Sequence, residues 1–213
     1  MNSTRNLIEQ LNALPFFTKM VIQQLGNQLE LKNASIDTYI SRFLKYKKII
    51  RLKNGFYVAS DFFNKNKADI FYTFYLANVI RTPSYVSSWT ALQYYNLATE
   101  SIYTITSISP KVTRLYKTKA GTFSFQSINE ELFSGFSLIK GASASSTSLF
   151  DFFMASPPKA LFDLLYFKTH RFRSVQFEDV RGLVEELRVD INEMTKKDRD
   201  VFFEMVRKQI RHE

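Results

Sequence analysis

The chain has 213 residues, of which 45% are hydrophobic and 23% are charged, values that are ordinary for a folded globular protein. It contains no cysteine and only two histidines, His170 and His212, which excludes disulfides, zinc fingers and thiol catalysis and leaves little for a histidine-dependent mechanism. It has no apolar run of 18 residues and no signal peptide, so we expect a cytoplasmic protein without a membrane partner.

The net charge of +9 is concentrated in the first third of the chain. Residues 1–67 carry 11 Lys and Arg against 4 Asp and Glu, a net charge of +7, whereas residues 68–213 carry 18 against 16, a net charge of +2. A local basic excess is typical of contact with a polyanion such as DNA. The alternative, that these residues only keep a small domain soluble, is weaker because the charge coincides with the motif described below.

Two helices are predicted before residue 30. Residues 3–13 have apolar side chains at helical spacing, and Pro15 ends that helix. Thr18 is placed to cap a second helix that ends at Gly26. This second helix is expected to bury four apolar side chains: Phe17, Met20, Val21 and Leu25.

Residues 36–58 change from a helical period to a strand period. On a helical wheel one face is apolar and the other polar. The apolar face holds Ile36, Ile40, Phe43 and Leu44, and the polar face holds Ala34, Thr38, Ser41, Arg42 and Lys45. Asn54-Gly55 between β-branched and aromatic runs then predicts a tight hairpin whose two turn residues both take positive φ.

Helix, helix, polar-faced helix and basic hairpin follow one another in the order of a winged helix-turn-helix, although a three-helix bundle would also give the first three elements. We therefore interpret residues 1–62 as a DNA-binding domain. The residues expected to face the major groove are Ser35, Thr38, Ser41, Arg42 and Lys45. The residues expected to contact phosphates or the minor groove from the wing are Lys48, Arg51, Lys53 and Asn54.

Residues 60–67 are interpreted as a connector, and residues 68–213 as a second, α+β domain with an antiparallel sheet and packed helices. Residues 69–80 predict a buried helix. Further helices are expected at 88–95, from Pro157-Pro158 to 167, at 178–188 and from Thr195 onward. Strands are expected at 102–108, 112–117, 122–128 and 133–139, while 149–154 is a strand or the start of a helix.

No catalytic chemistry is predicted. The chain has no GxSxG elbow and no phosphate-binding glycine loop. A Gly-Ser turn before paired carboxylates would indicate a nucleotidyltransferase, but Phe153 stands where the second carboxylate is needed to hold metal ions. Asp163 is expected to be a structural carboxylate bonded to a backbone amide or to Lys159. We therefore expect no catalytic residue, no metal and no cofactor.

Three stretches together resemble the AbiEi antitoxins of the AbiE abortive-infection, or type IV, toxin–antitoxin systems. They are RFLKYKKIIRLKNGFYV (42–58), PSYVSSWTALQYYNL (83–97) and SPPKALFDLLYF (156–167), and the likeness spans about residues 14–170. The last is similar to the family's Ser-Pro-Glu-Lys-Ala-Leu-x-Asp-Leu-Leu-Tyr signature, with Pro158 in place of the usual Glu. The resemblance implies a winged-helix domain that represses its own operon, a C-terminal domain needed for antitoxicity, and a cognate nucleotidyltransferase-like toxin.

The sequence thus leads us to expect a non-enzymatic autorepressor and antitoxin of a phage-defence system, with operator DNA and the toxin as partners. One competing interpretation is a winged-helix regulator whose second domain binds a small-molecule effector; an apolar pocket with several convergent polar groups would favour it. Another makes the second domain only a protein-interaction module.

Overall fold

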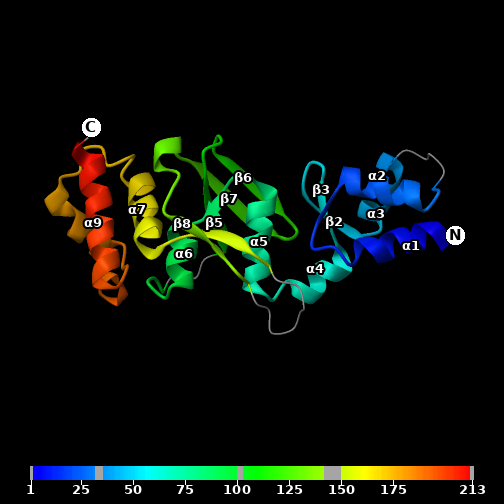
Figure 1. Cartoon of the computed structure of the whole chain (residues 1–213), viewed down its shortest axis with the longest axis horizontal. Coiled ribbons are helices and arrows are strands. Elements are labelled where there is room, and N and C mark those ends of the chain that lie inside the picture. The colour runs from blue at the N-terminus through cyan, green and yellow to red at the C-terminus, as the bar shows by residue number, and fades with distance from the viewer. Residues whose placement is uncertain (1, 32–35, 100–102, 142–149, 212–213) are drawn as a thin grey trace.

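The computed structural model describes residues 2–31, 36–99, 103–141 and 150–211, and these form an α+β protein (Figure 1). Its helices are α1 (Asn2–Leu11), α2 (Lys19–Gln28), α3 (Ile36–Lys45), α4 (Ser60–Asn66), α5 (Ile70–Ile80), α6 (Ser88–Tyr94), α7 (Pro157–Lys168), α8 (Val180–Glu186) and α9 (Lys196–Arg211). Its strands are β1 (Phe17–Thr18), β2 (Ile49–Lys53), β3 (Phe56–Ala59), β4 (Tyr85–Val86), β5 (Thr104–Ser109), β6 (Arg114–Thr118), β7 (Gly121–Ser127), β8 (Phe136–Ile139) and β9 (Phe152–Ala155). Three 3-10 turns cover Glu130–Leu132, Phe177–Asp179 and Ile191–Glu193.

The first half of the molecule comprises the elements from α1 to β3. Its helices α1, α2 and α3 pack against a three-stranded sheet of order β1-β3-β2, in which both pairs are antiparallel. Thr18 caps α2 as predicted, since its hydroxyl accepts a hydrogen bond from the Val21 amide at 3.4 Å. Met20, expected to be buried, is instead 67% exposed, and Ile22 takes the inward position. Residues 32–35, which precede α3, lie outside the described residues.

The hairpin predicted around Asn54-Gly55 is present as β2 and β3, but its turn differs from the expected type. Gly55 has a φ of 77°, whereas Asn54 does not take positive φ, so the turn is not type I′. The register shifts between Arg51 and Lys53, which marks a bulge just before the turn. The bulge changes the local twist, so the chain reverses with one left-handed residue in place of two.

The second half of the molecule comprises the elements from α5 to α9 and is built on a six-stranded sheet of order β6-β7-β5-β4-β9-β8. The expectation of an antiparallel sheet or meander is wrong in part, because β5 pairs with β7, and β4 with β9, in parallel. The other three pairs, β6–β7, β4–β5 and β8–β9, are antiparallel. The two-residue strand β4 was not predicted, and residues 149–154 supply a strand, β9, as one of the two alternatives allowed.

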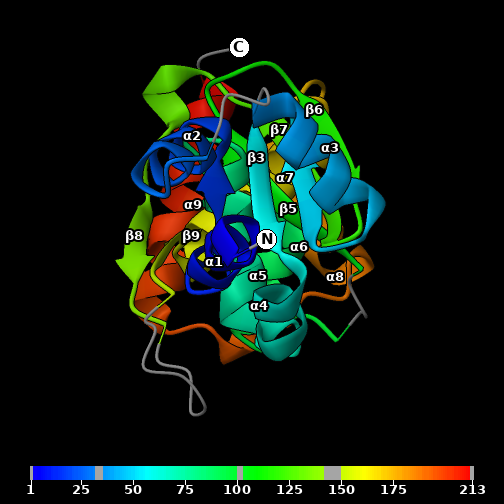
Figure 2. The ribbon, with the colours of Figure 1, turned by 90° about the vertical axis from the view of Figure 1, so that its right-hand side faces the viewer.

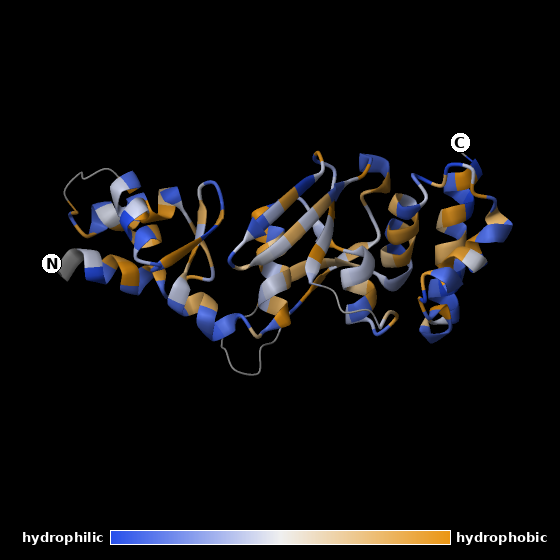
Figure 3. Ribbon diagram, turned by 180° about the vertical axis from the view of Figure 1, so that it is seen from behind, coloured by the Kyte–Doolittle hydropathy of each residue, from blue (hydrophilic) through white to orange (hydrophobic). Residues whose placement is uncertain are grey.

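Helices lie on both sides of this sheet along the length of the molecule. Figure 1 shows α7 between the sheet and α9, which lies near the C-terminus, while α5 lies on the side nearer the first half. As predicted, α5 is largely buried and α7 begins at Pro157-Pro158, both tolerated in a first turn. The ribbon of α7 is mostly apolar in colour (Figure 3), in keeping with its buried residues from Pro158 to Tyr166.

The two halves meet over a shared hydrophobic boundary. Residues 60–66, interpreted as part of a connector, form α4, whose Phe62 ring packs 5.6 Å from that of Tyr72. The Tyr72 hydroxyl donates a hydrogen bond to the Pro15 carbonyl at 2.8 Å. Leu52 and Val58 of the hairpin belong to the larger hydrophobic cluster, which is that of the second half. The other buried hydrophobic residues between Leu7 and Ala59 form a smaller cluster of their own. The hairpin therefore packs on both sides.

Across the described ranges, the structure contains no helix that is both long enough and apolar enough to cross a membrane.

Candidate nucleic-acid interface

The polar face predicted for residues 36–45 is present on α3. Tyr39, Ile40 and Phe43 are buried in the smaller hydrophobic cluster, so the opposite face of the helix points outward. Asp37 in the first turn and Lys45 in the last turn both complement the helix dipole. The outward residues border a shallow depression of about 340 Å³, which is lined by Asp37, Thr38, Ser41, Arg42 and Lys45. Ser41, Arg42 and Lys45 are exposed and Thr38 is half-buried.

The one carboxylate on this face is paired. Lys19, at the start of α2, lies with its Nζ 2.7 Å from Asp37 Oδ1. Both side chains are partly exposed, so the pair contributes little to folding. Its effect on the surface is larger, because it offsets a negative charge that would repel a phosphate. Sequence reasoning missed Lys19, since the pairing depends on how α2 packs against α3.

Further cations follow the end of α3. Lys47 is exposed with a φ of 55°, and the Lys48 amide donates to the Phe43 carbonyl at 2.8 Å, which closes the helix. Ser60 fixes this turn, because its hydroxyl donates to the Lys47 carbonyl at 2.7 Å and its amide to the Lys48 carbonyl at 2.9 Å. Lys47 and Lys48 therefore add two exposed cations at the C-terminal end of α3.

The hairpin carries two exposed candidates. Arg51 is exposed on β2 opposite Tyr57, with its guanidinium carbon 6.0 Å from the centre of that ring. Asn54 is exposed in the turn. Figure 2, seen from the N-terminal side, shows α3 next to the strands that follow it in the chain, and α3 and β2 are in contact.

Lys53 lies in a different environment from the other candidates. Its Nζ lies 3.8 Å from the centre of the Phe56 ring, and it lines a cleft between the halves. Partial burial lowers the pKa of Lys53, and the nearby cations Lys111 and Arg81 of the second half lower it further. Lys53 is therefore less available to a phosphate than Arg51.

Of the nine predicted DNA contacts, the structure brings four together on α3 and two more beside it. Thr38, Ser41, Arg42 and Lys45 line one depression on the helix, Lys48 follows the end of the helix, and Arg51 lies on β2, the strand that contacts α3. Lys53 and Asn54 lie at the turn of the hairpin, next to the second half. Ser35 lies outside the described residues. No group of three or more acidic or histidine side chains that could hold a metal ion occurs in the described part of the chain.

A scan against models of protein families found no match for this chain, and no curated protein matched it.

Proposed function

We propose that the chain is a DNA-binding autorepressor and antitoxin that counteracts a cognate nucleotidyltransferase-like toxin in the cytoplasm, without catalysis of its own. Residues 1–62 form the winged helix-turn-helix of this proposal, with α3 in the major groove and the β2–β3 hairpin as its wing.

The polar face of α3 is the observation that carries the DNA-binding part. The helix buries three aromatic or aliphatic side chains on one side and presents Ser41, Arg42 and Lys45 on the other, with its single carboxylate offset by Lys19. Arginine at such a position can make two hydrogen bonds to a guanine edge, and lysine attracts the phosphate backbone. The order α1, α2, α3, β2, β3 supports the same class of domain.

The antitoxin part rests on the resemblance of residues 42–58, 83–97 and 156–167. The last of these stretches, residues 156–167, consists of Ser156, the residue before α7, and of all of α7 except its last residue. The stretch is largely buried, so we assign it to the framework of the second half and expect the toxin, if it is contacted directly, to meet other surfaces.

Separating the two activities tests the proposal. The full chain should repress a reporter placed behind the DNA upstream of its own gene, and it should rescue the growth of cells that express the neighbouring toxin. Arg42→Ala should weaken repression and leave rescue intact, while Arg5→Ala on α1 should change neither. A full-length protein that represses but never rescues would remove the antitoxin part, and one that does neither would remove both.

A regulator controlled by a small molecule is the second candidate, and one cleft favours it. Between the halves lies a cavity of about 410 Å³, a size suited to small ligands. Aromatic and polar side chains both line it: Phe16, Lys53, Phe56, Tyr75, Asn78, Val79, Thr82, Asp151 and Phe153. A ligand bound there would contact the hairpin directly and could thereby alter DNA binding.

A further inference from the structure

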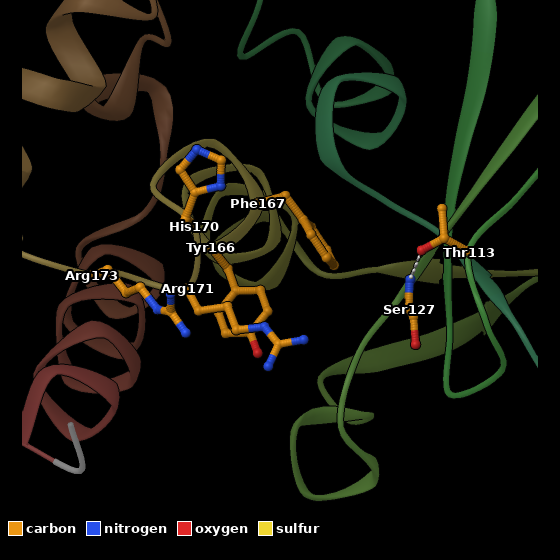
Figure 4. Close-up of a pocket in the computed structure, with 7 residues that line it drawn as sticks. All are labelled: Thr113, Ser127, Tyr166, Phe167, His170, Arg171 and Arg173. Carbon is orange, nitrogen blue, oxygen red and sulfur yellow. Dashed lines mark hydrogen bonds between the residues drawn. The ribbon is translucent and has the colours of Figure 1, made fainter.

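A second basic site lies at the C-terminal end of α7. A cavity of about 390 Å³ is lined by residues of α7, of the turn that follows it, and of the ends of β6 and β7: Tyr166, Phe167, His170, Arg171, Arg173, Thr113 and Ser127. In Figure 4 the side chains of Phe167 and Arg171 extend from the α7 side toward Thr113 and Ser127 on the other side. The volume falls within the range of small-ligand sites.

The charges around this cavity are of one sign. His170, Arg171 and Arg173 are all exposed, and no carboxylate of the described residues lines the cavity. Among the described residues, none of these three side chains has an ion pair or a side-chain hydrogen bond. Thr113 and Ser127 add hydroxyl groups, and the Thr113 hydroxyl already accepts from the Ser127 amide at 3.1 Å. The site therefore offers several donors and positive charges to an anion.

The turn that carries these cations has an unusual backbone. His170, Arg171, Phe172 and Ser174 have φ values of 51°, 73°, 65° and 57°. Left-handed φ is unfavourable at non-glycine residues and is concentrated at functional sites. Such a turn persists only where the surrounding structure holds it.

Three contacts hold the turn in this conformation. Phe172 is buried, with its ring 5.5 Å from that of Phe162. The Arg171 amide donates to the Tyr166 carbonyl at 2.6 Å, and the Phe172 amide to the Thr169 hydroxyl at 2.9 Å. With Phe172 anchored inside, the flanking Arg171 and Arg173 remain at the surface. The two guanidinium groups are thus presented by a fixed turn.

An aromatic surface adjoins the cations. Phe167 also lines a neighbouring cavity of about 170 Å³, whose other walls include Trp89, Gln126 and Lys168. A ligand that places an anionic group near Arg171 could thus lay a planar group against Phe167, toward Trp89. Flat π-systems stack on such side chains, and Gln126 and Lys168 add polar groups nearby.

We propose that this site binds a phosphomonoester attached to an aromatic group, of the size of a nucleoside monophosphate. Arginine matches phosphate oxygens with pairs of charge-assisted hydrogen bonds, and the absence of a lining carboxylate favours a doubly charged phosphate. The aromatic part would lie on Phe167. The inference does not depend on DNA binding by α3 or on antitoxicity.

Binding to the full chain tests this, with two readouts: calorimetry and the fluorescence of Trp89, the only tryptophan in the chain. The probes are AMP, CMP, adenosine, inorganic phosphate and a blunt duplex DNA without terminal phosphates. The variant is Arg171→Gln with Arg173→Gln. The matched control is Lys196→Gln with Lys197→Gln, which removes the same charge from exposed residues of α9.

We expect AMP or CMP to bind and to change Trp89 fluorescence, with adenosine and inorganic phosphate each at least about tenfold weaker. The arginine variant should lose about tenfold or more in affinity, the scale of charged hydrogen bonds, and the lysine control should match the wild type. Absence of mononucleotide binding at millimolar concentration, or binding that the arginine variant does not weaken, would overturn the inference. Binding of the duplex through these arginines without mononucleotide binding would also overturn it, because the cavity would then be part of a nucleic-acid surface.

Discussion

Lys159 Nζ lies 2.8 Å from Asp163 Oδ1, one turn apart on α7, and both side chains are buried. The other carboxylate oxygen accepts hydrogen bonds from the Ser87 hydroxyl at 2.7 Å and the Tyr85 hydroxyl at 3.1 Å. Burial raises the pKa of the Asp163 carboxyl, and the Lys159 ammonium and the two hydroxyls oppose that rise. The network ties α7 to β4 and its adjoining residue, which makes the α7 stretch structural, as predicted for Asp163.

Removing one partner of this ion pair should destabilise the second half strongly. Asp163→Ala leaves a buried ammonium without its counter-charge, and we expect the free energy of unfolding to fall by about 3–5 kcal/mol. Lys159→Met combined with Asp163→Leu should cost less than Asp163→Ala alone, because no charge is left buried. Urea unfolding followed by circular dichroism measures both. An Asp163→Ala protein within about 0.5 kcal/mol of the wild type would show that the pair is not needed.

Buried tyrosines should make the fold sensitive to alkali. Burial, with Tyr94 and Asp198 adding to it, raises the pKa of Tyr95 to about 12, and burial raises the pKa of Tyr72 and Tyr85 as well. Between about pH 10 and 12 the unfolded chain loses these protons while the folded chain keeps them, so stability falls as pH rises.

Tyr95→Phe should lessen this dependence, because it removes one of the ionising hydroxyls. It also removes the hydrogen bond to the Ala155 carbonyl, which should lower stability at every pH. Urea midpoints measured from pH 8 to 11.5 for both proteins give the two effects separately. Parallel curves for variant and wild type above pH 10 would contradict the assignment.

Gly55 should be needed for the shape of the hairpin. Its φ of 77° strains any branched residue, although a Cβ there would meet nothing within 4 Å. Gly55→Val should therefore distort the turn and weaken DNA binding, while Gly55→Asn, which tolerates left-handed φ, should retain most of it. Fluorescence anisotropy with labelled duplex compares them. Equal binding by the valine variant and the wild type would mean that the hairpin is not a wing.

The sequence predicted the elements whose signals are local. The Thr18 cap, the almost entirely apolar composition of α5, the Pro157-Pro158 helix start and the two-faced pattern of α3 each depend on neighbouring residues, and all four are present. The features that depend on distant partners were missed. They include the parallel pairing of β5 with β7, the short β4 and the packing of α4, whose Phe62 has its partners at Tyr72 and Phe150.

In the candidate site, too, the features set by neighbouring residues were predicted and those set by distant partners were not. Periodicity identified the outward residues of α3, but it did not reveal that Lys19 reaches Asp37 or that the hairpin turn lies against the second half. Those facts follow from tertiary packing, and the second changes what we expect from Lys53.

Arg51 and Lys53 should differ in their effect on DNA binding. Loss of one phosphate contact lowers the salt slope, the dependence of log affinity on log salt concentration, by about 0.9. Arg51→Ala should show that decrease, whereas Lys53→Ala should show a smaller one, because Lys53 is partly buried beside Phe56. Salt titrations of both variants decide the matter. Equal decreases would mean that the hairpin turn reaches the DNA in spite of the second half.

The central claim is that α3 reads the sequence of DNA. The preference of the protein for one duplex over another tests this claim most directly. We would measure the affinity of the full chain for the duplex upstream of its gene and for a scrambled duplex, with wild type, Arg42→Ala and the exposed control Arg5→Ala. If Arg42 reads a guanine edge, its loss should reduce the ratio of the two affinities by about 5- to 150-fold, equivalent to about 1–3 kcal/mol, and Arg5→Ala should leave the ratio unchanged. An Arg42→Ala protein with the wild-type ratio would contradict the account.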